Sequence, residues 1–267
     1  MHKIIFPEAS NEYIKEAASR LNMICEPILV ESSVQDAAVK ILDGEADAMI
    51  AGIDYSSRDV ILATRDVIGI AEGRKTFSSL FVAKFPNGQR IIISDGATCK
   101  NPTSEQLADI IELANDAAAK ILDDQPRLAV LSFSTFGSGG KDPSMEKTAE
   151  AIALIRERRP DILVDGEMQL DAAVNPRVGE KKAAAHGGSE VAGHANVLIV
   201  PDINSGNILY KSIEQFAGAT VAGPILLGFA KPVSDLSRGS TVEDVILTAE
   251  SLLKLIWFSA SFSLCYK

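Results

Sequence analysis

The first fifty residues alternate between short apolar runs and stretches with helical spacing, and this alternation is the strongest constraint on the fold. Lys3 to Phe6 is apolar and stops at Pro7, as a buried strand does. The strand-like runs are residues 3–6, 27–30 and 48–51, and the helical stretches are residues 11–22 and 34–42. Strands separated by helices imply crossover connections, so the sequence predicts βαβ units, a mostly parallel sheet and an α/β fold.

A hairpin signal interrupts this rhythm. Pro86-Asn87-Gly88 lies between the apolar runs Phe77–Phe85 and Arg90–Ser94. Asn-Gly suits the positive φ angles of a tight turn, so these runs are predicted to pair antiparallel. The hairpin marks a second layer or subdomain.

Composition narrows the class of protein. A chain of 267 residues can form one large domain or two smaller ones, and its net charge of −10 argues against binding to nucleic acid or an anionic membrane surface. Three scattered cysteines predict a reducing compartment, with neither a disulfide framework nor a zinc site. With no signal-peptide pattern and no apolar stretch long enough to span a bilayer, we expect a cytoplasmic protein.

Ligands of parallel sheets bind beyond the carboxyl ends of the strands. The loops Pro7-Glu8-Ala9 and Gly52–Ser57 are therefore candidate ligand loops. The small-residue loop Ser134–Lys141 is either a flexible turn or a ligand-facing loop. It matches neither a Walker loop nor GxGxxG, because Asp142 occupies the Ser/Thr position of the first and the third glycine of the second.

Metal binding is not expected. Asp165, Glu167 and Asp171 form a carboxylate cluster, but they are better interpreted as charges at strand and helix ends. His186 and His194 fall in a glycine-rich loop and are predicted to be solvated.

Residues 221–244 contain the most suggestive stretch. An apolar run is followed by a polar turn that holds Asp235, Ser237 and Arg238, and then by the cap and acidic first turn of a helix that includes Asp244. A helix N-terminus with a guanidinium beside it is a plausible anion site. The same pattern also fits a capped helix after a buried strand, with Asp235 and Arg238 as solvated turn charges.

Four blocks of sequence carry a family resemblance. GPILLGFAKPVSDLSRG resembles the C-terminal block of the phosphate acetyltransferase / phosphate butyryltransferase family, and VLSFST, VDGEMQLDAAVNP and ANVLIVPDINSGNILYK resemble its earlier blocks. The four occur in the family's order between residues 128 and 246, which is far more specific than any one of them.

The resemblance implies an enzyme that moves an acetyl or other short acyl group between coenzyme A and inorganic phosphate, as in acetate metabolism through acetyl phosphate. It implies no metal, no covalent intermediate and no resident cofactor, since coenzyme A is a substrate. The implied fold is similar to that of the isocitrate and isopropylmalate dehydrogenases, with two α/β domains and a cleft between them. The domains would be residues 1–75 plus 224–267, and residues 76–223, in a homodimer.

Site residues follow by matching positions. Asp244 matches the family's carboxylate that takes the thiol proton, Arg238 the arginine that holds the phosphate, and Ser237 the hydroxyl that steadies the developing oxyanion. The expected substrate-binding residues are Ser56, Ser57, Ser134, Thr135, Asn204, Gly206, Asn207 and Lys231.

The chain departs from the family in its N-terminal third. A segment that precedes the block around Gly52 is absent, Tyr55 replaces a histidine, and Leu62 stands where the family has an arginine. Arg58 or Arg65 could substitute from one helical turn away. These departures leave open a weak or inactive relative that binds acyl-CoA or phosphate as a sensor or partner domain. A nicotinamide-dependent dehydrogenase of related fold fits the DLSRG motif poorly.

Overall fold

In the computed structural model, which describes residues 1–262 of the backbone and 1–256 of the side chains, the chain divides into two compact units. The first unit comprises Met1–Val82 and Ala219–Lys267, and the second comprises Ala83–Gly218. The first unit extends past residue 75 because strand β4 (Ser78–Lys84) lies beside β9 (Thr220–Leu227). The sequence after Ile256 is apolar and aromatic, and its side chains lie outside those that the structure describes.

The first unit contains a sheet in the order β2-β1-β3-β10-β9-β4. Its other strands are β1 (Lys3–Phe6), β2 (Glu26–Leu29), β3 (Ala48–Ala51) and β10 (Val233–Asp235). β2, β1, β3 and β10 run parallel, whereas β9 pairs antiparallel with β10. The βαβ prediction for the first fifty residues is therefore confirmed.

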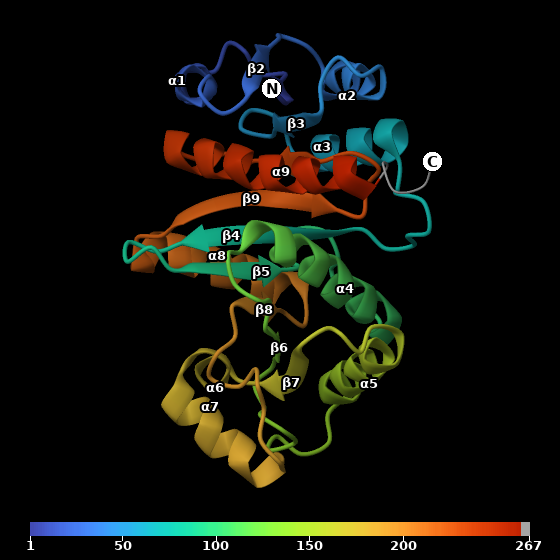
Figure 1. The fold of residues 1–267 in the computed structure, drawn as a ribbon, viewed down its shortest axis with the longest axis vertical. Helices are drawn as coiled ribbons and strands as arrows, with labels where there is room; N and C mark the ends of the chain where they lie inside the picture. Colours follow the sequence, from blue (N-terminus) through green and yellow to red (C-terminus); the bar gives the residue numbers. More distant parts are fainter. Residues whose placement is uncertain (263–267) are drawn as a thin grey trace. The chain divides into compact units, whose positions relative to one another are not determined.

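Helices of the first unit begin where the sequence offers caps. They are α1 (Glu12–Leu21), α2 (Val34–Leu42), α3 (Ser57–Ala63), the π-helical turn η1 (Thr64–Ile68) and α9 (Val242–Phe262). Asn11 and Ser33 accept hydrogen bonds from the first backbone N–H groups of α1 and α2. In Figure 1, α9 runs along β9, and these two elements are in contact. A hydrophobic core of this unit contains side chains from both its strands and its helices, such as Met49 of β3 and Val60 of α3.

The second unit contains four parallel strands in the order β5-β8-β6-β7. They are β5 (Arg90–Ser94), β8 (Val197–Ile199), β6 (Leu128–Leu131) and β7 (Val164–Met168). The helices are α4 (Ser104–Ile121), α5 (Pro143–Arg158), α6 (Leu170–Val174), α7 (Pro176–Ala183), the 3-10 turn η2 (Ala184–His186) and α8 (Ile203–Ala217). The predicted hairpin is present as β4 and β5, and the turn between them has Gly88 at φ 86°.

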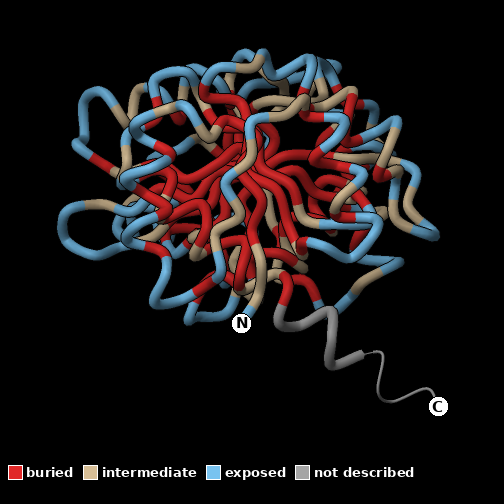
Figure 2. The backbone as a smooth tube through the Cα atoms, turned by 90° about the horizontal axis from the view of Figure 1, so that it is seen from above, coloured by how far each residue is buried: buried red, intermediate tan, exposed pale blue. Residues whose placement is uncertain are grey.

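Burial follows this architecture. Figure 2 shows the buried segments concentrated in the interior and the exposed segments at the periphery. α4 illustrates the cause, because its apolar side chains recur every three or four residues and nine of its eighteen residues are buried.

Candidate active site

The carboxyl edge of the first unit's sheet brings together three loops. β1, β3 and β10 are parallel, so the segments that follow them, 7–11, 52–56 and 236–241, leave the sheet at the same edge. The strand order β2-β1-β3 also reverses direction at β1, and such a switch point opens a crevice between the loops after β1 and β3. Both loops predicted as ligand loops lie here.

A buried carboxylate closes this crevice. Glu8, which is 3% exposed, accepts hydrogen bonds from the backbone N–H groups of Gly52 (3.0 Å), Asp54 (2.6 Å) and Tyr55 (2.9 Å). Burial raises the pKa of Glu8, although these N–H groups favour its ionised form and oppose the shift. Glu8 thus fixes the loop after β3, and the loop's N–H groups are already occupied.

Gly52 makes the closest packing contact at this edge. Its φ of 105° is one that L side chains rarely adopt, and a Cβ at this position would lie 2.8 Å from the N atom and 2.9 Å from the O atom of Leu236, and closer still to Oδ1 of Asp235. The loop after β3 can therefore approach β10 only with glycine here.

We expect Gly52→Ala to lower the free energy of unfolding by about 3 kcal/mol, because backbone strain and steric overlap each cost on the order of 1–3 kcal/mol. Urea unfolding measures the change. Gly44→Ala is the matched control, since Gly44 also has a positive φ of 78° but a Cβ there meets nothing within 4 Å. Equal losses in the two variants would contradict the close contact with β10.

Ser237 and Arg238 lie in the turn between β10 and α9. Ser237 is half-buried, and its Oγ accepts a hydrogen bond of 3.3 Å from the N–H of Gly239. Arg238 is exposed, and in the part of the chain that the structure describes no carboxylate forms a salt bridge with it. A guanidinium held at a strand end and not neutralised by a neighbour is available to an anionic ligand.

Asp244 is placed differently. It is 4% exposed, and its carboxylate accepts hydrogen bonds from the N–H of Val221 (2.9 Å) and from the N–H and hydroxyl of Thr241 (2.8 Å each). The Thr241 hydroxyl in turn accepts from the N–H of Asp244 at 3.3 Å, which completes a reciprocal cap at the start of α9. The carboxylate therefore already stabilises the helix start and β9.

Ser56 and Ser57 stand at the start of α3. Ser56 caps the helix, since its hydroxyl accepts from the N–H of Asp59 and donates to that residue's carboxylate at 2.7 Å. Ser57 is exposed beside it. Of the two arginines proposed to replace the one missing at Leu62, Arg65 forms a salt bridge with Asp66, whereas Arg58 is exposed and has no salt-bridge partner among the described residues.

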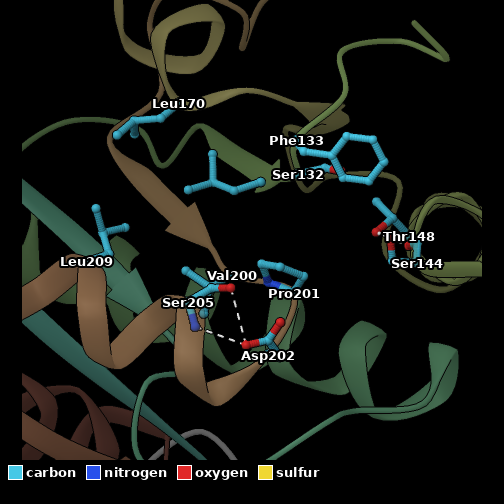
Figure 3. Close-up of a pocket in the computed structure, with 11 residues that line it drawn as sticks. Ser132, Phe133, Ser144, Thr148, Leu170, Val200, Pro201, Asp202, Ser205 and Leu209 are labelled. Atoms are coloured by element: carbon cyan, nitrogen blue, oxygen red, sulfur yellow. Dashed lines mark hydrogen bonds between the residues drawn. The ribbon is translucent and has the colours of Figure 1, made fainter. Parts of the chain in front are cut away.

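The second unit has a cavity of about 410 Å³ beyond the carboxyl ends of β6 and β8 (Figure 3). Leu170 and Leu209 lie on one side of it and Phe133 on the other. Asp202 caps α8 at its floor by accepting a hydrogen bond of 2.9 Å from the N–H of Ser205. The remaining lining residues are Leu131, Ser132, Ser144, Thr148, Val200 and Pro201. The walls are mainly apolar with a few polar groups, which is typical of small-molecule pockets, and the size falls within their usual range of roughly 300–1,000 Å³.

Ser134 and Thr135 are buried next to this cavity. The Ser134 hydroxyl donates to Glu167 at 2.8 Å and accepts from the N–H of Gly139 at 2.8 Å. Glu167 also accepts from the N–H of Gly137 at 2.7 Å, so it holds the loop after β6 as Glu8 holds the loop after β3. The Thr135 hydroxyl accepts from the N–H of Gln169 at 3.0 Å. Internal partners thus occupy both hydroxyls predicted to bind substrate, and the loop is tied to β7.

Three residues predicted to bind substrate lie at the start of α8. This helix begins at Ile203, because Asp202 supplies its cap. Asn204 and Asn207 are exposed on its first turns, and Gly206 is buried where a Cβ would lie 2.7 Å from the Cα of Gly96. Asp202 and Ser205 line the cavity and were not predicted, although an aspartate before an amphipathic stretch is a recognisable cap signal.

Lys231 is not brought together with Ser237 and Arg238. It precedes β10, whereas they follow it, so they leave opposite ends of the same strand. Its exposed side chain belongs to the amino edge of that strand.

The described residues contain no group of three His, Cys, Asp or Glu side chains able to hold a metal ion. Of the predicted carboxylate cluster, Glu167 fixes a loop, Asp165 accepts from Arg156 at 3.3 Å, and Asp171 is exposed. At the surface, Nε2 of His194 lies 3.6 Å from Oε1 of Glu180.

Asp235 differs from one of the two interpretations of residues 221–244, in which it is a solvated turn charge. It is the last residue of β10 and is 0% exposed. Burial and the charge of Glu8 raise its pKa to about 7, against a smaller lowering by the Ser57 hydroxyl. A single aspartate at the end of a three-residue strand gives no local pattern that would reveal burial.

In the first unit an exposed arginine and a half-buried hydroxyl follow β10, and in the second unit an apolar cavity lies beyond β6 and β8. Both features follow the carboxyl ends of parallel strands, where α/β proteins bind their ligands. The protein belongs to the phosphate acetyl/butaryl transferase family, whose model matches residues 30–250.

Individual relatives agree with this assignment. The chain is 44% identical over 217 residues to the phosphate acetyltransferase of Treponema pallidum, a match that covers 79% of this chain and 64% of the relative. The chain thus spans a little under two thirds of that relative's length.

Solved structures give the same fold. A phosphotransacetylase from Streptococcus pyogenes superimposes with a TM-score of 0.84 at 30% identity, covering 96% of this chain and 94% of the other. A 4-hydroxythreonine-4-phosphate dehydrogenase from Klebsiella pneumoniae superimposes with a TM-score of 0.54 at 12% identity, covering 97% of this chain and 98% of the other, which relates the fold alone to the dehydrogenases. Within the described residues, none of the helices combines the length and apolar character required to cross a membrane.

Proposed function

We propose that this chain catalyses transfer of an acetyl or other short acyl group between coenzyme A and inorganic phosphate. The observation that carries the proposal is Arg238, which by resemblance matches the family's phosphate-holding arginine. Its side chain is exposed at the carboxyl edge of the sheet and has no salt-bridge partner in the described chain. The reaction converts acyl-CoA and phosphate into acyl phosphate and free thiol, so no electrons are gained or lost. Coenzyme A is then a substrate, and no resident cofactor is required.

Arg238 and Ser237 take the anionic part of this reaction. A guanidinium donates two parallel hydrogen bonds to a phosphate and so fixes its orientation as well as its position. The Ser237 hydroxyl is one residue away and is half-buried, so it can donate to the oxygen on which negative charge develops. Arg58, exposed on α3 and without a salt-bridge partner among described residues, is our candidate for the second cation.

The cavity in the second unit suits the uncharged part of coenzyme A. Its walls are largely apolar, and none of the described residues that line it is a lysine or an arginine. It is therefore better suited to a neutral chain or ring than to a diphosphate. The hydroxyls of Ser144, Thr148 and Ser205 already donate to acceptors within the chain, so their oxygens can accept hydrogen bonds from amide N–H groups of such a ligand.

The test is phosphate-dependent release of free thiol from acetyl-CoA, propionyl-CoA and butyryl-CoA. Turnover that requires phosphate supports the proposal, and the donor with the highest kcat/KM identifies the acyl group. A folded protein that binds coenzyme A but gives no phosphate-dependent thiol with any donor would contradict it and favour a binding role.

We further propose a cytoplasmic homodimer in which α8 contributes to the interface. The cytoplasmic assignment is supported by Cys25 and Cys99, which are free thiols. The dimer is supported by an apolar surface on α8, where Phe216 is 89% exposed and Ile208 is 67% exposed, while only Gly206 and Tyr210 of this helix are buried.

Phe216→Glu is expected to shift the mass measured by light scattering from twice 28.4 kDa towards 28.4 kDa, because a charge in an apolar interface is costly to desolvate. Gln215→Glu, which adds the same charge at the neighbouring exposed position, is the control and should leave the mass unchanged. A wild-type protein that is monomeric at micromolar concentration would overturn the proposal.

A further inference from the structure

A second cavity of the second unit, of about 610 Å³, lies at the amino edge of its strands. Its lining includes Arg90, the first residue of β5, Arg127, which precedes β6, and Asn196, which precedes β8. Because β5, β8 and β6 run parallel, this edge of the sheet is opposite to the one that carries the apolar cavity. None of the residues assigned to acyl transfer lines this second cavity.

The cavity gathers positive charge in a chain whose net charge is −10. The cations that line it are Lys84, Arg90 and Arg127, and the acids are Asp123 and Asp124. The side chains of the two acids are 88% and 66% exposed, whereas those of the two arginines are only 27% and 25% exposed. Water screens an exposed charge more strongly than a half-buried one, so positive charge dominates inside the cavity.

Arg127 is held in one orientation by its neighbours. Its Nε donates to the carbonyl oxygen of His194 at 2.6 Å, and its Nη2 donates to Oδ2 of Asp124 at 2.8 Å. Its backbone N–H donates to Oδ1 of Asn196 at 2.7 Å. Among the residues that the structure describes, Nη1 has no partner. A guanidinium that is already fixed on two sides loses little conformational freedom when its third nitrogen binds an anion.

Arg90 is a largely buried cation that lacks a close partner. Its Nη1 lies 4.0 Å from Oδ2 of Asp123, which is beyond hydrogen-bond distance, and no other carboxylate of the described chain forms a salt bridge with it. Taking a charge out of water without hydrogen bonds is costly, so an anionic ligand would relieve this cost. Lys84, exposed at the end of β4 across the hairpin turn, also has no salt-bridge partner among the described residues.

We propose that this cavity binds a small anion that carries two or more negative charges on phosphate or carboxylate oxygens. Arg90 and Nη1 of Arg127 donate to these oxygens, since a guanidinium matches the geometry of both groups. Lys84 adds a further positive charge at the hairpin. Leu122 and Val174 line the same cavity and accommodate the carbon skeleton of an organic anion. This site is separate from the proposed acyl transfer and does not depend on it.

The experiment is calorimetric titration with inorganic pyrophosphate and, separately, with citrate at low ionic strength. We expect at least one of them to bind with a Kd below about 1 mM, and the tighter one shows whether phosphate or carboxylate oxygens are preferred. Arg90→Ala should weaken that binding by about 10–10²-fold, as the loss of a charge-assisted hydrogen bond does. Lys84→Ala, at an exposed position, should weaken it several-fold. Arg156→Ala is the matched control, because Arg156 belongs to the same unit, is 63% exposed and does not line the cavity.

Arg238→Ala separates this cavity from the proposed active site, which also takes phosphate. Anion binding that survives in Arg238→Ala and is weakened in both Arg90→Ala and Lys84→Ala supports the proposal. A Kd above about 1 mM for both anions, unchanged affinity in Arg90→Ala and Lys84→Ala, or binding that is lost only in Arg238→Ala would overturn it. A protein that binds the anion through Arg90 but gives no phosphate-dependent thiol release would refute the proposed acyl transfer and keep this site.

Discussion

Arg238→Ala is expected to lower kcat/KM for phosphate-dependent thiol release by about 10²–10⁴-fold. The guanidinium is exposed at the end of β10 and is not paired with a carboxylate in the described chain, so none of its charge is neutralised before phosphate binds. Each charge-assisted hydrogen bond contributes about 1.5–3 kcal/mol, and a bidentate contact loses two of them at once. Initial rates at varied phosphate concentration measure the loss, most of which should appear in the KM for phosphate.

Two further substitutions sharpen this result. Arg238→Lys keeps the positive charge but not the planar fork, so it should recover only part of the activity. Arg177→Ala removes an equally exposed arginine from α7, outside the proposed site, and should leave kinetics unchanged. An Arg238→Ala protein within twofold of wild type would remove Arg238 from the proposed site.

The fold could be predicted from sequence because its signals are local. The short apolar runs separated by helical spacing define β1, β2 and β3 with α1 and α2, and Asn87-Gly88 defines the hairpin of β4 and β5. Each signal spans fewer than twenty residues and depends on side-chain periodicity or on the preferences of one turn. Parallel pairing then places the loops after β1, β3 and β10 at one edge without further information.

The internal bonding of the site could not be predicted in this way. Glu8 accepts hydrogen bonds from residues 44 to 47 positions later in the chain, and Glu167 accepts one from Ser134, 33 positions earlier. Such contacts leave no trace in local periodicity. For the same reason, Ser134 and Thr135 matched a family block without any sign that their hydroxyls are occupied by neighbours in the folded chain.

The environments of Asp235 and Asp244 could not be predicted from sequence either. Asp235 opens the DLSRG motif and Asp244 follows it. One interpretation of the sequence placed Asp235 in a solvated turn, and the family resemblance made Asp244 the proton acceptor. In the structure both are buried, but only Asp244 is satisfied by hydrogen bonds. Desolvation and hydrogen bonding, which decide the pKa of an acid, are properties of tertiary packing.

Asp235→Asn is expected to remove a large pH dependence from the stability of the protein. Burial raises the pKa of Asp235 to about 7 in the folded state, from an ordinary value of 3.8. Because the folded state binds this proton more tightly, the contribution is fully present below pH about 4, falls as pH rises, and is lost above pH about 7. A shift of about three pH units corresponds to roughly 4 kcal/mol of unfolding free energy, at 1.36 kcal/mol per unit.

Urea unfolding at pH 4, 6 and 8 tests this expectation. At each pH we take the unfolding free energy of Asp235→Asn minus that of wild type. This difference should rise by up to roughly 4 kcal/mol between pH 4 and pH 8, because asparagine has no charge to desolvate. A flat difference for Asp235→Asn would mean that the acid ionises without penalty. A variant that gains stability above pH 7 while losing turnover would instead identify Asp235 as an acid retained for function at the expense of stability.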